Sequence, residues 1–214
     1  MKFKEAKDTL GSFEFGKSAR SGDLTSRTSY AYLIWNRLLE NLTPLDLIQA
    51  KEVLDFAQNV GFRHDGMPSD EYLLHPIRVA ALSGLFNKEY INLSIQVGLL
   101  HNVYELAKIE RSEIVHKYGN AVDSALSTLR IDRSKQRNDE YLQNYYTSIG
   151  NLPYNLGLVK VIDKLDNLYT LDSTSTKEMK KLYLREVEMF VVPLCNKVSP
   201  FLDSPLRELI KSLN

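Results

Sequence analysis

Apolar residues recur at helical spacing along most of this chain, and no segment of useful length alternates between apolar and polar residues. Helical spacing puts an apolar side chain on one face every three or four residues, whereas strict alternation is the pattern of a half-buried strand. The stretch 99–106 has the helical pattern most clearly, with apolar residues at Leu99, Leu100, Val103 and Leu106. The sequence therefore predicts an all-α protein.

The composition narrows the class of protein. A length of 214 residues and a hydrophobic fraction of 43% suit one domain with a proper core. Lys plus Arg and Asp plus Glu number 27 each, so no overall charge favours DNA or an anionic membrane, and we expect neither as a partner. The single cysteine, Cys195, excludes an intramolecular disulfide, and no apolar run approaches the roughly 18 residues of a membrane-spanning helix. With no signal-peptide pattern at the N-terminus, we expect a soluble cytoplasmic protein.

The expected helices divide the chain into parts. Little periodicity and several glycines indicate a loop-rich arm over residues 1–28, and a packing helix follows over 29–42. Ser204 and Pro205 favour a short helix near the end of the chain, with Ser204 as its cap. We therefore expect a loop-then-helix extension, a main helical domain and a C-terminal helix, over residues 1–44, 45–198 and 199–214.

Capping residues and helix breakers predict limits within the main domain. Thr43 can cap a helix that Pro44 opens and that ends before Gly61. Gly119 is expected to interrupt a later helix, and Pro193 to kink or end the last long one. The remaining helices are expected over 91–106, 111–118, 121–129, 156–171 and 176–194, with polar loops over 63–70 and 131–138.

Polar residues interrupt the apolar helix over 91–106. His101 and Glu105 are four residues apart, so on one helix they would share a face. An imidazole and a carboxylate placed in this way can converge on a metal ion or on a water that the metal holds. For any single pair of this kind, a core histidine satisfied by a glutamate is the alternative.

Two further segments carry polar residues in apolar surroundings. His75 precedes Pro76, and because proline suits the first helical turn, His75 is expected at a helix entry. Asp163 and Asn167, again four apart, lie within the apolar helix over 156–171. The chain thus has polar groups on three separate helices that could face a common site.

In this order, these residues resemble the metal-ligand set of the HD superfamily of metal-dependent phosphohydrolases. The resemblance is to the (p)ppGpp hydrolase domain of the RelA/SpoT proteins and their small stand-alone relatives, and it covers roughly residues 45–198. Leu-Leu-His-Asn at 99–102 is similar to Leu-Leu-His-Asp of the family, and Leu-Leu-His-Pro at 73–76 is similar to its Ile-x-His-Pro. The matching segments are 63–68, 72–80, 98–105, 118–119, 159–168, 185–186 and 193–197.

The resemblance implies an HD-domain helical bundle and a divalent metal, Mn²⁺ or a similar ion, which suits hydrolysis of a pyrophosphate ester. The metal ligands that it implies are His75, His101, Asp163 and the residue at Asn102. It assigns Glu105 and Asn167 to the catalytic set, and Arg63, Tyr72 and Lys160 to substrate contact.

Two positions depart from the family pattern. The aspartate of the His-Asp pair is Asn102, whose amide oxygen can touch a metal but carries no charge to offset a divalent cation. The second acid of the family's Glu-Asp pair is Leu106, which can neither accept a proton nor hold a water. The motif is therefore degenerate at its centre.

Three functions stay open. The one we favour is a catalytically impaired domain that binds a nucleotide, such as a guanosine polyphosphate, or a protein. The alternative is an active (pyro)phosphohydrolase on (p)ppGpp or a related nucleotide, using His75, His101, Asp163 and Glu105. The third is a purely structural helical module, which would not need buried carboxylates at Glu105 and Asp163. No synthetase-like segment follows residue 198, so we do not expect a bifunctional enzyme.

Overall fold

The computed structural model describes residues 9–10 and 13–214. Within them every regular element is helical, and the only β-type pairing is an isolated bridge between His64 and Met67, which confirms the all-α prediction. The helices are α2 (Phe13–Ser21), α3 (Leu24–Leu39), α4 (Pro44–Asn59), α5 (Ser69–Phe86), α6 (Ile91–Leu100), α7 (Val103–Leu106), α8 (Arg111–Leu129), η1 (Arg133–Lys135), α9 (Asp139–Gly150), α10 (Tyr154–Thr174), α11 (Lys177–Glu186), η2 (Val187–Val191), α12 (Val192–Val198), η3 (Pro200–Leu202) and α13 (Asp203–Leu213).

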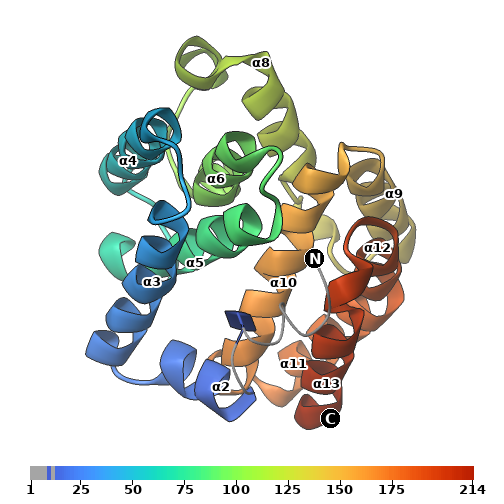
Figure 1. The fold of residues 1–214 in the computed structure, drawn as a ribbon. Helices are drawn as coiled ribbons and strands as arrows, with labels where there is room; N and C mark the ends of the chain where they lie inside the picture. Colours follow the sequence, from blue (N-terminus) through green and yellow to red (C-terminus); the bar gives the residue numbers. More distant parts are fainter. Residues whose placement is uncertain (1–8, 11–12) are drawn as a thin grey trace.

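Helix α10 runs through the middle of the bundle (Figure 1). It packs against α2, α5 and α6 on one side and against α9, α12 and α13 on the other. Because neighbours surround it, its polar residues lie inside the molecule, and Lys160, Asp163, Lys164 and Asp166 are all buried. Buried charges need partners, so α10 is where a polar site is expected.

Helices α5 and α6 cross with their backbones in close approach. A Cβ atom at Gly98 would lie 2.6 Å from the Cα of Ala80, so only glycine fits this crossing without displacing backbone. The crossing brings the helix that carries His75 next to the end of the helix that precedes His101.

Local helix signals are confirmed at Thr43 and Pro44, at Gly119 and at Pro193. The Thr43 side chain accepts a hydrogen bond from the Asp46 amide, and Pro44 is the first residue of α4. Gly119 has a φ of 81° and breaks the helical path within α8. Pro193 follows a π-helical turn, η2, which separates α11 from α12. A proline cannot donate the backbone bond that an unbroken helix needs at this position.

His75 does not lie at a helix entry, and that prediction is wrong. Helix α5 begins at Ser69, so His75 and Pro76 lie inside it. Proline removes one backbone hydrogen bond from the helix. Nearly all of α5 after its first turn is buried, and this packing sustains the helix despite the missing bond.

The predicted continuous helix over 91–106 is also wrong. Helix α6 ends at Leu100, and the short helix α7 starts at Val103. The Gly98 carbonyl accepts a hydrogen bond from Nδ1–H of His101 at 2.7 Å, although a continuing helix would pair this carbonyl with the Asn102 amide. The turn at 101–102 means that His101 and Glu105 do not share one helix face.

The N-terminal and C-terminal segments need corrections too. Residues 13–28 are helical rather than loop-rich, because α2 and the start of α3 lie there; residues 1–8 and 11–12 of the predicted arm lie outside the described residues. Ser204 is not a cap, since α13 begins at Asp203 and the Ser204 hydroxyl bonds to Glu208 within the helix. The division of the chain at residues 44 and 198 stays a prediction.

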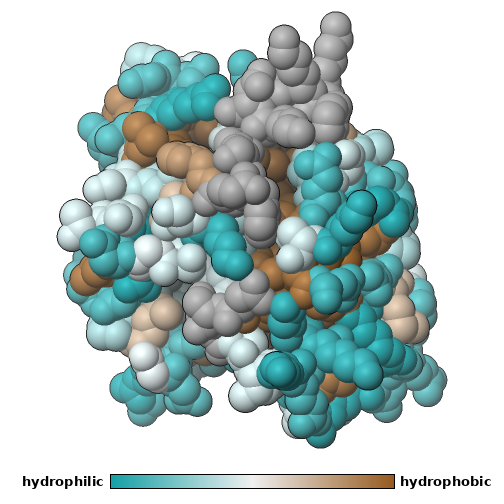
Figure 2. Space-filling view, turned by 90° about the horizontal axis from the view of Figure 1, so that it is seen from below, coloured by the Kyte–Doolittle hydropathy of each residue, from teal (hydrophilic) through white to brown (hydrophobic). Residues whose placement is uncertain are grey.

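Helix α9 is absent from the elements expected above, although its sequence carries a signal. Its buried residues Leu142, Tyr145, Tyr146 and Ile149 have helical spacing, and the side chain of Asn138 caps it. No helix in the described part of the chain is both long and apolar enough to cross a bilayer. The face seen in Figure 2 is mostly hydrophilic, with hydrophobic residues gathered near its middle.

Candidate functional site

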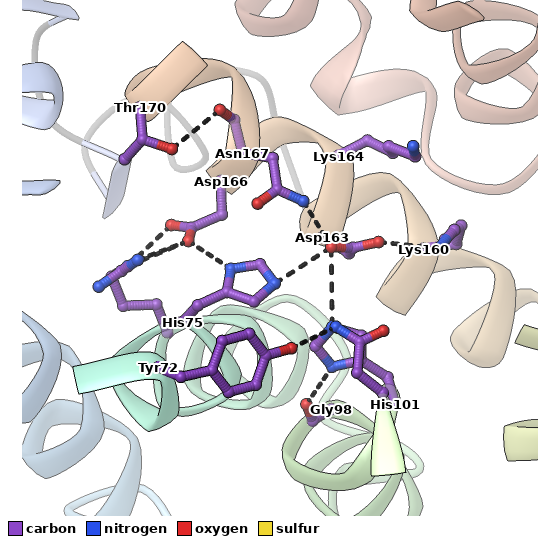
Figure 3. Close-up of polar contacts among 12 residues, drawn as sticks. Tyr72, His75, Gly98, His101, Lys160, Asp163, Lys164, Asp166, Asn167 and Thr170 are labelled. Atoms are coloured by element: carbon purple, nitrogen blue, oxygen red, sulfur yellow. Dashed lines mark hydrogen bonds and ion pairs between the residues drawn. The ribbon is translucent and has the colours of Figure 1, made fainter. Parts of the chain in front are cut away.

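Three helical segments bring His75, His101 and Asp163 together (Figure 3). His75 comes from α5, His101 from the turn after α6, and Asp163 from α10. The Nε2 atoms of His75 and His101 lie 3.1 Å and 3.6 Å from Oδ1 of Asp163. Ligand atoms of all three residues lie within 4.8 Å of one another, which is a spacing that one metal ion can bridge.

The imidazole of His101 is oriented by the main chain. Its Nδ1–H donates to the Gly98 carbonyl, so the neutral ring has its lone pair on Nε2. Nε2 of His101 faces Oδ1 of Asp163, and a metal ion held between these two atoms would be bound by both residues. The ring is therefore held in the tautomer that metal binding requires.

The imidazole of His75 lies between two carboxylates. Nδ1 is 2.8 Å from Oδ2 of Asp166, and Nε2 faces Asp163. Burial disfavours the charged ring, but the hydrogen bonds to Asp163 and Asp166 outweigh it and raise the pKa of His75 above its ordinary value. A metal at Nε2 would replace that proton, while Asp166 would keep the Nδ1–H bond.

Asp166 is held by two arginines. Arg78 donates from Nε and Nη2 at 3.0 Å and 2.9 Å, and Arg20 donates from Nε at 2.6 Å. Burial alone would raise the pKa of Asp166, but Arg78 and Arg20 hold it well below its usual range. No role was predicted for Asp166 from the sequence. Its spacing from Asp163 was the available signal, because residues three apart share a helix face.

Asp163 has further partners on its own helix. Lys160 donates from Nζ to Oδ2 at 2.9 Å, and Asn167 donates from Nδ2 to Oδ1 at 2.8 Å. Burial opposes ionisation, but Lys160 and the two imidazoles hold the pKa of Asp163 well below its usual range. The pKa of Lys160 is correspondingly raised well above normal by Asp163, against the effect of burial. Asp163 is therefore a charged ligand at neutral pH.

The two departing positions have different surroundings. The Asn102 amide donates from Nδ2 to the Tyr72 hydroxyl at 2.6 Å, and the same nitrogen lies 2.9 Å from Nε2 of His101. Leu106 is half-buried and packs against the hydrophobic core. Glu105 accepts hydrogen bonds from the Ile131 amide at 3.1 Å and from Nε of Arg133 at 3.3 Å.

A cavity of about 280 Å³ opens beside His75 and Asp163. Arg63, which was predicted to contact substrate, is exposed and does not line this cavity. Other residues predicted for the site do line it: Tyr72, Asn102, Glu105, Lys160 and Asn167. His64, the neighbour of Arg63, lines the cavity and stacks on Tyr72 with the ring centroids 5.2 Å apart. Further basic and polar residues in the lining are Arg133, Gln136, Lys164, Thr170, Ser175 and Tyr183.

No protein-family model and no curated protein matches this sequence. Among solved structures, a metazoan ortholog of SpoT that hydrolyses ppGpp and plays a role in starvation responses matches with a TM-score of 0.63 at 21% sequence identity. The match covers 77% of this chain and 94% of that protein. This likeness shows that the chain shares the all-α fold of that hydrolase, and the His75, His101 and Asp163 cluster within the fold could bind a metal ion.

Proposed function

We propose that this protein is a catalytically impaired member of the (p)ppGpp-hydrolase type, which binds a guanosine polyphosphate or a related nucleotide and turns it over very slowly or not at all. The fold, the position of the cavity and the resemblance of the surrounding segments support the type of ligand. The residues at positions 102 and 106 of the site support the impairment.

The donor set fits a divalent transition metal such as Mn²⁺. Two imidazoles and one carboxylate, with positions left for water or substrate, are a known arrangement for such ions. A metal there would polarise a phosphoryl oxygen and lower the pKa of a bound water. Asn102 weakens the site, because its amide offers no charge and its N–H group faces the lone pair of His101.

The observation that supports impaired catalysis is that the acidic side chains lining the cavity are few and already hydrogen-bonded. Among the described lining residues, Glu105 is the only carboxylate besides Asp163. The Glu105 side chain is only 6% exposed, and both of its oxygens already accept hydrogen bonds from Ile131 and Arg133. With Leu106 in place of the second acid, no unpaired carboxylate is at hand to move a proton.

The basic residues of the lining favour a ligand that carries phosphate groups. Lys160, Lys164 and Arg133 border the same cavity, although each has a carboxylate partner in this structure. A bound phosphate would share these basic side chains with their carboxylate partners and would add charge-assisted hydrogen bonds. The stacked rings of His64 and Tyr72 give the cavity an aromatic edge against which a base could lie.

An active hydrolase is the second candidate. The observation that favours it is that the three strongest metal ligands converge and that Glu105 borders the same cavity. Under this alternative Arg133 would release Glu105 when substrate enters.

The experiment restores the missing acids with the double variant Asn102→Asp/Leu106→Asp. We expect it to bind Mn²⁺ more tightly than the parent, to gain melting temperature with added metal, and to hydrolyse a guanosine 3′-pyrophosphate measurably. Asn102→Ala/Leu106→Ala is the matched control. Tighter metal binding without hydrolysis would indicate a different ligand. Unfolding that Mn²⁺ does not rescue would contradict the metal site and favour a structural module.

A further inference from the structure

Helix α2 reaches the site from outside the region of family resemblance. Its residue Arg20 precedes residues 45–198, yet its side chain is 0% exposed and donates to Oδ1 of Asp166 at 2.6 Å. Asp166 in turn accepts from Nδ1 of His75 at 2.8 Å. A single carboxylate thus separates the N-terminal segment from a candidate metal ligand.

The guanidinium of Arg20 has a fixed place. It lies over the ring of Tyr30 from α3 and that of Tyr169 from α10, at 4.7 Å and 4.1 Å from the ring centroids. Its Nη1 donates to the Gly16 carbonyl at 3.1 Å. A Cβ atom at Gly16 would lie 2.5 Å from the Tyr169 ring, so α2 packs very closely on α10. Rings on two helices and a carbonyl on α2 therefore hold Arg20 in position.

The bonds of Asp166 are divided between its oxygens. Oδ2 accepts hydrogen bonds from His75 and from Nη2 of Arg78, and Oδ1 accepts one from Arg20. Nε of Arg78 is shared between Oδ1 at 3.0 Å and Oδ2 at 3.1 Å. Without Arg20, Oδ1 would keep one partner and the carboxylate could rotate about its Cβ–Cγ bond. Such a rotation would shift the acceptor that orients the ring of His75.

We propose that Arg20 is a positioning residue of the metal site. It fixes Asp166, and through Asp166 it fixes the ring orientation of His75 and the tautomer that leaves Nε2 open to a metal. The docking of helix α2 therefore sets the metal affinity of a site built on α5, α6 and α10. This inference rests on the metal site of the proposed function.

The test uses Co²⁺, because its visible absorption reports the ligand geometry as well as the occupancy. Titration of the full chain is compared with Arg20→Met and with Arg27→Met. Arg27 is the matched control: it fastens α3 to α5 through Nη2 and Glu71 at 2.9 Å but does not contact Asp166. We expect Arg20→Met to raise the Kd about 10- to 100-fold and to change the spectrum, as outer-shell substitutions do. Arg27→Met should change the Kd less than about twofold.

If Arg20→Met does not fold, Arg20→Lys is the variant that tests the role of Arg20. It keeps the buried charge but donates from one nitrogen, so we expect a Kd raised severalfold. In the metal-free protein at alkaline pH, ¹⁵N NMR should find His75 protonated on Nδ1 in the parent and in a mixture of tautomers in Arg20→Lys. Unchanged Kd, spectrum and tautomer in the Arg20 variants would overturn this proposal alone. A parent chain that binds no Co²⁺ would overturn the metal site as well.

Discussion

The two histidines of the site differ in the groups that bond to their Nδ1 atoms. His75 bonds through Nδ1 to Asp166, a buried carboxylate that Arg20 and Arg78 hold in place. His101 bonds through Nδ1 to a main-chain carbonyl, and the residue that follows it is an amide. The His75 half therefore has a full set of charged partners, while the His101 half lacks the acids that the family resemblance leads one to expect.

This difference separates metal binding from catalysis. The ligand atoms of both halves converge, so the metal-binding geometry does not depend on the missing acids. Proton transfer would depend on the second acid, which Leu106 replaces, whereas Asn102 weakens the metal site itself; both positions lie on the His101 half. A site of this kind can keep a ligand-binding role after its chemistry has declined. Substitutions in either half, or in Asp163, which both halves share, test this difference.

The largest effect is expected from Asp163→Asn, which removes the charge that the two halves share. Metal affinity should fall more than about 100-fold, because a direct ligand matters at least as much as an outer-shell partner. Lys160 would lose its buried partner, and breaking such a pair costs about 3–5 kcal/mol. Calorimetric titration and urea unfolding measure the two effects. An unchanged Kd would mean that metal binds elsewhere.

Asn102→Asp should strengthen the weaker half. A carboxylate beside His101 would offset the charge of the metal, and we expect the Kd for Mn²⁺ to fall about tenfold, or about 1.4 kcal/mol. The melting temperature of the metal-loaded variant should rise accordingly. Asn102→Ser is the neutral control. Equal Mn²⁺ affinity in Asn102→Asp and the parent would count against an Asn102 position in the coordination sphere.

The pH dependence of stability in the metal-free protein reports on the His75 half of the site. The folded state raises the pKa of His75, so its stabilising contribution is full below the unfolded value of about 6.5 and is lost as pH rises through the folded pKa. Metal must displace the same proton, so the Kd should rise about tenfold per pH unit below that pKa. Thermal unfolding and Co²⁺ titration across pH 5 to 9 test both. In His75→Gln, the alkaline loss of stability should disappear.

The smallest effect on metal binding is expected from Leu106→Asp alone. Leu106 packs against the core, and its replacement should cost about 1–3 kcal/mol of unfolding free energy for the polar group placed there. Metal affinity should change less than about threefold, because Asn102 still lies beside His101. A gain as large as that of Asn102→Asp would show that position 106 contacts the metal.

The sequence could predict what depends on local signals. Thr43 with Pro44, the break at Gly119 and the disturbance at Pro193 follow from capping and backbone geometry, and the structure has all three. Helical periodicity also predicted α10, although α10 is longer at both ends than expected.

Features that depend on distant contacts could not be read in this way. Arg20 is buried against Asp166, which lies 146 residues further along the chain. Pro76 resembles a helix start, yet tertiary packing continues α5 through it. The turn after Leu100 depends on the hydrogen bond from His101 to Gly98, which apolar spacing does not report. For the candidate site, the order of the motifs pointed to the segments that bring His75, His101 and Asp163 together, but not to the partners of His75.

We propose above all that this chain retains a metal site without efficient chemistry. The most direct measurement is the turnover of a guanosine 3′-pyrophosphate by the parent protein after its Mn²⁺ occupancy has been determined. We predict that metal-loaded protein turns over far more slowly than the median enzyme rate of about 10 per second. Turnover near that rate would contradict the claim, because it would mean that Glu105 and the His75, His101 and Asp163 set suffice without the two missing acids.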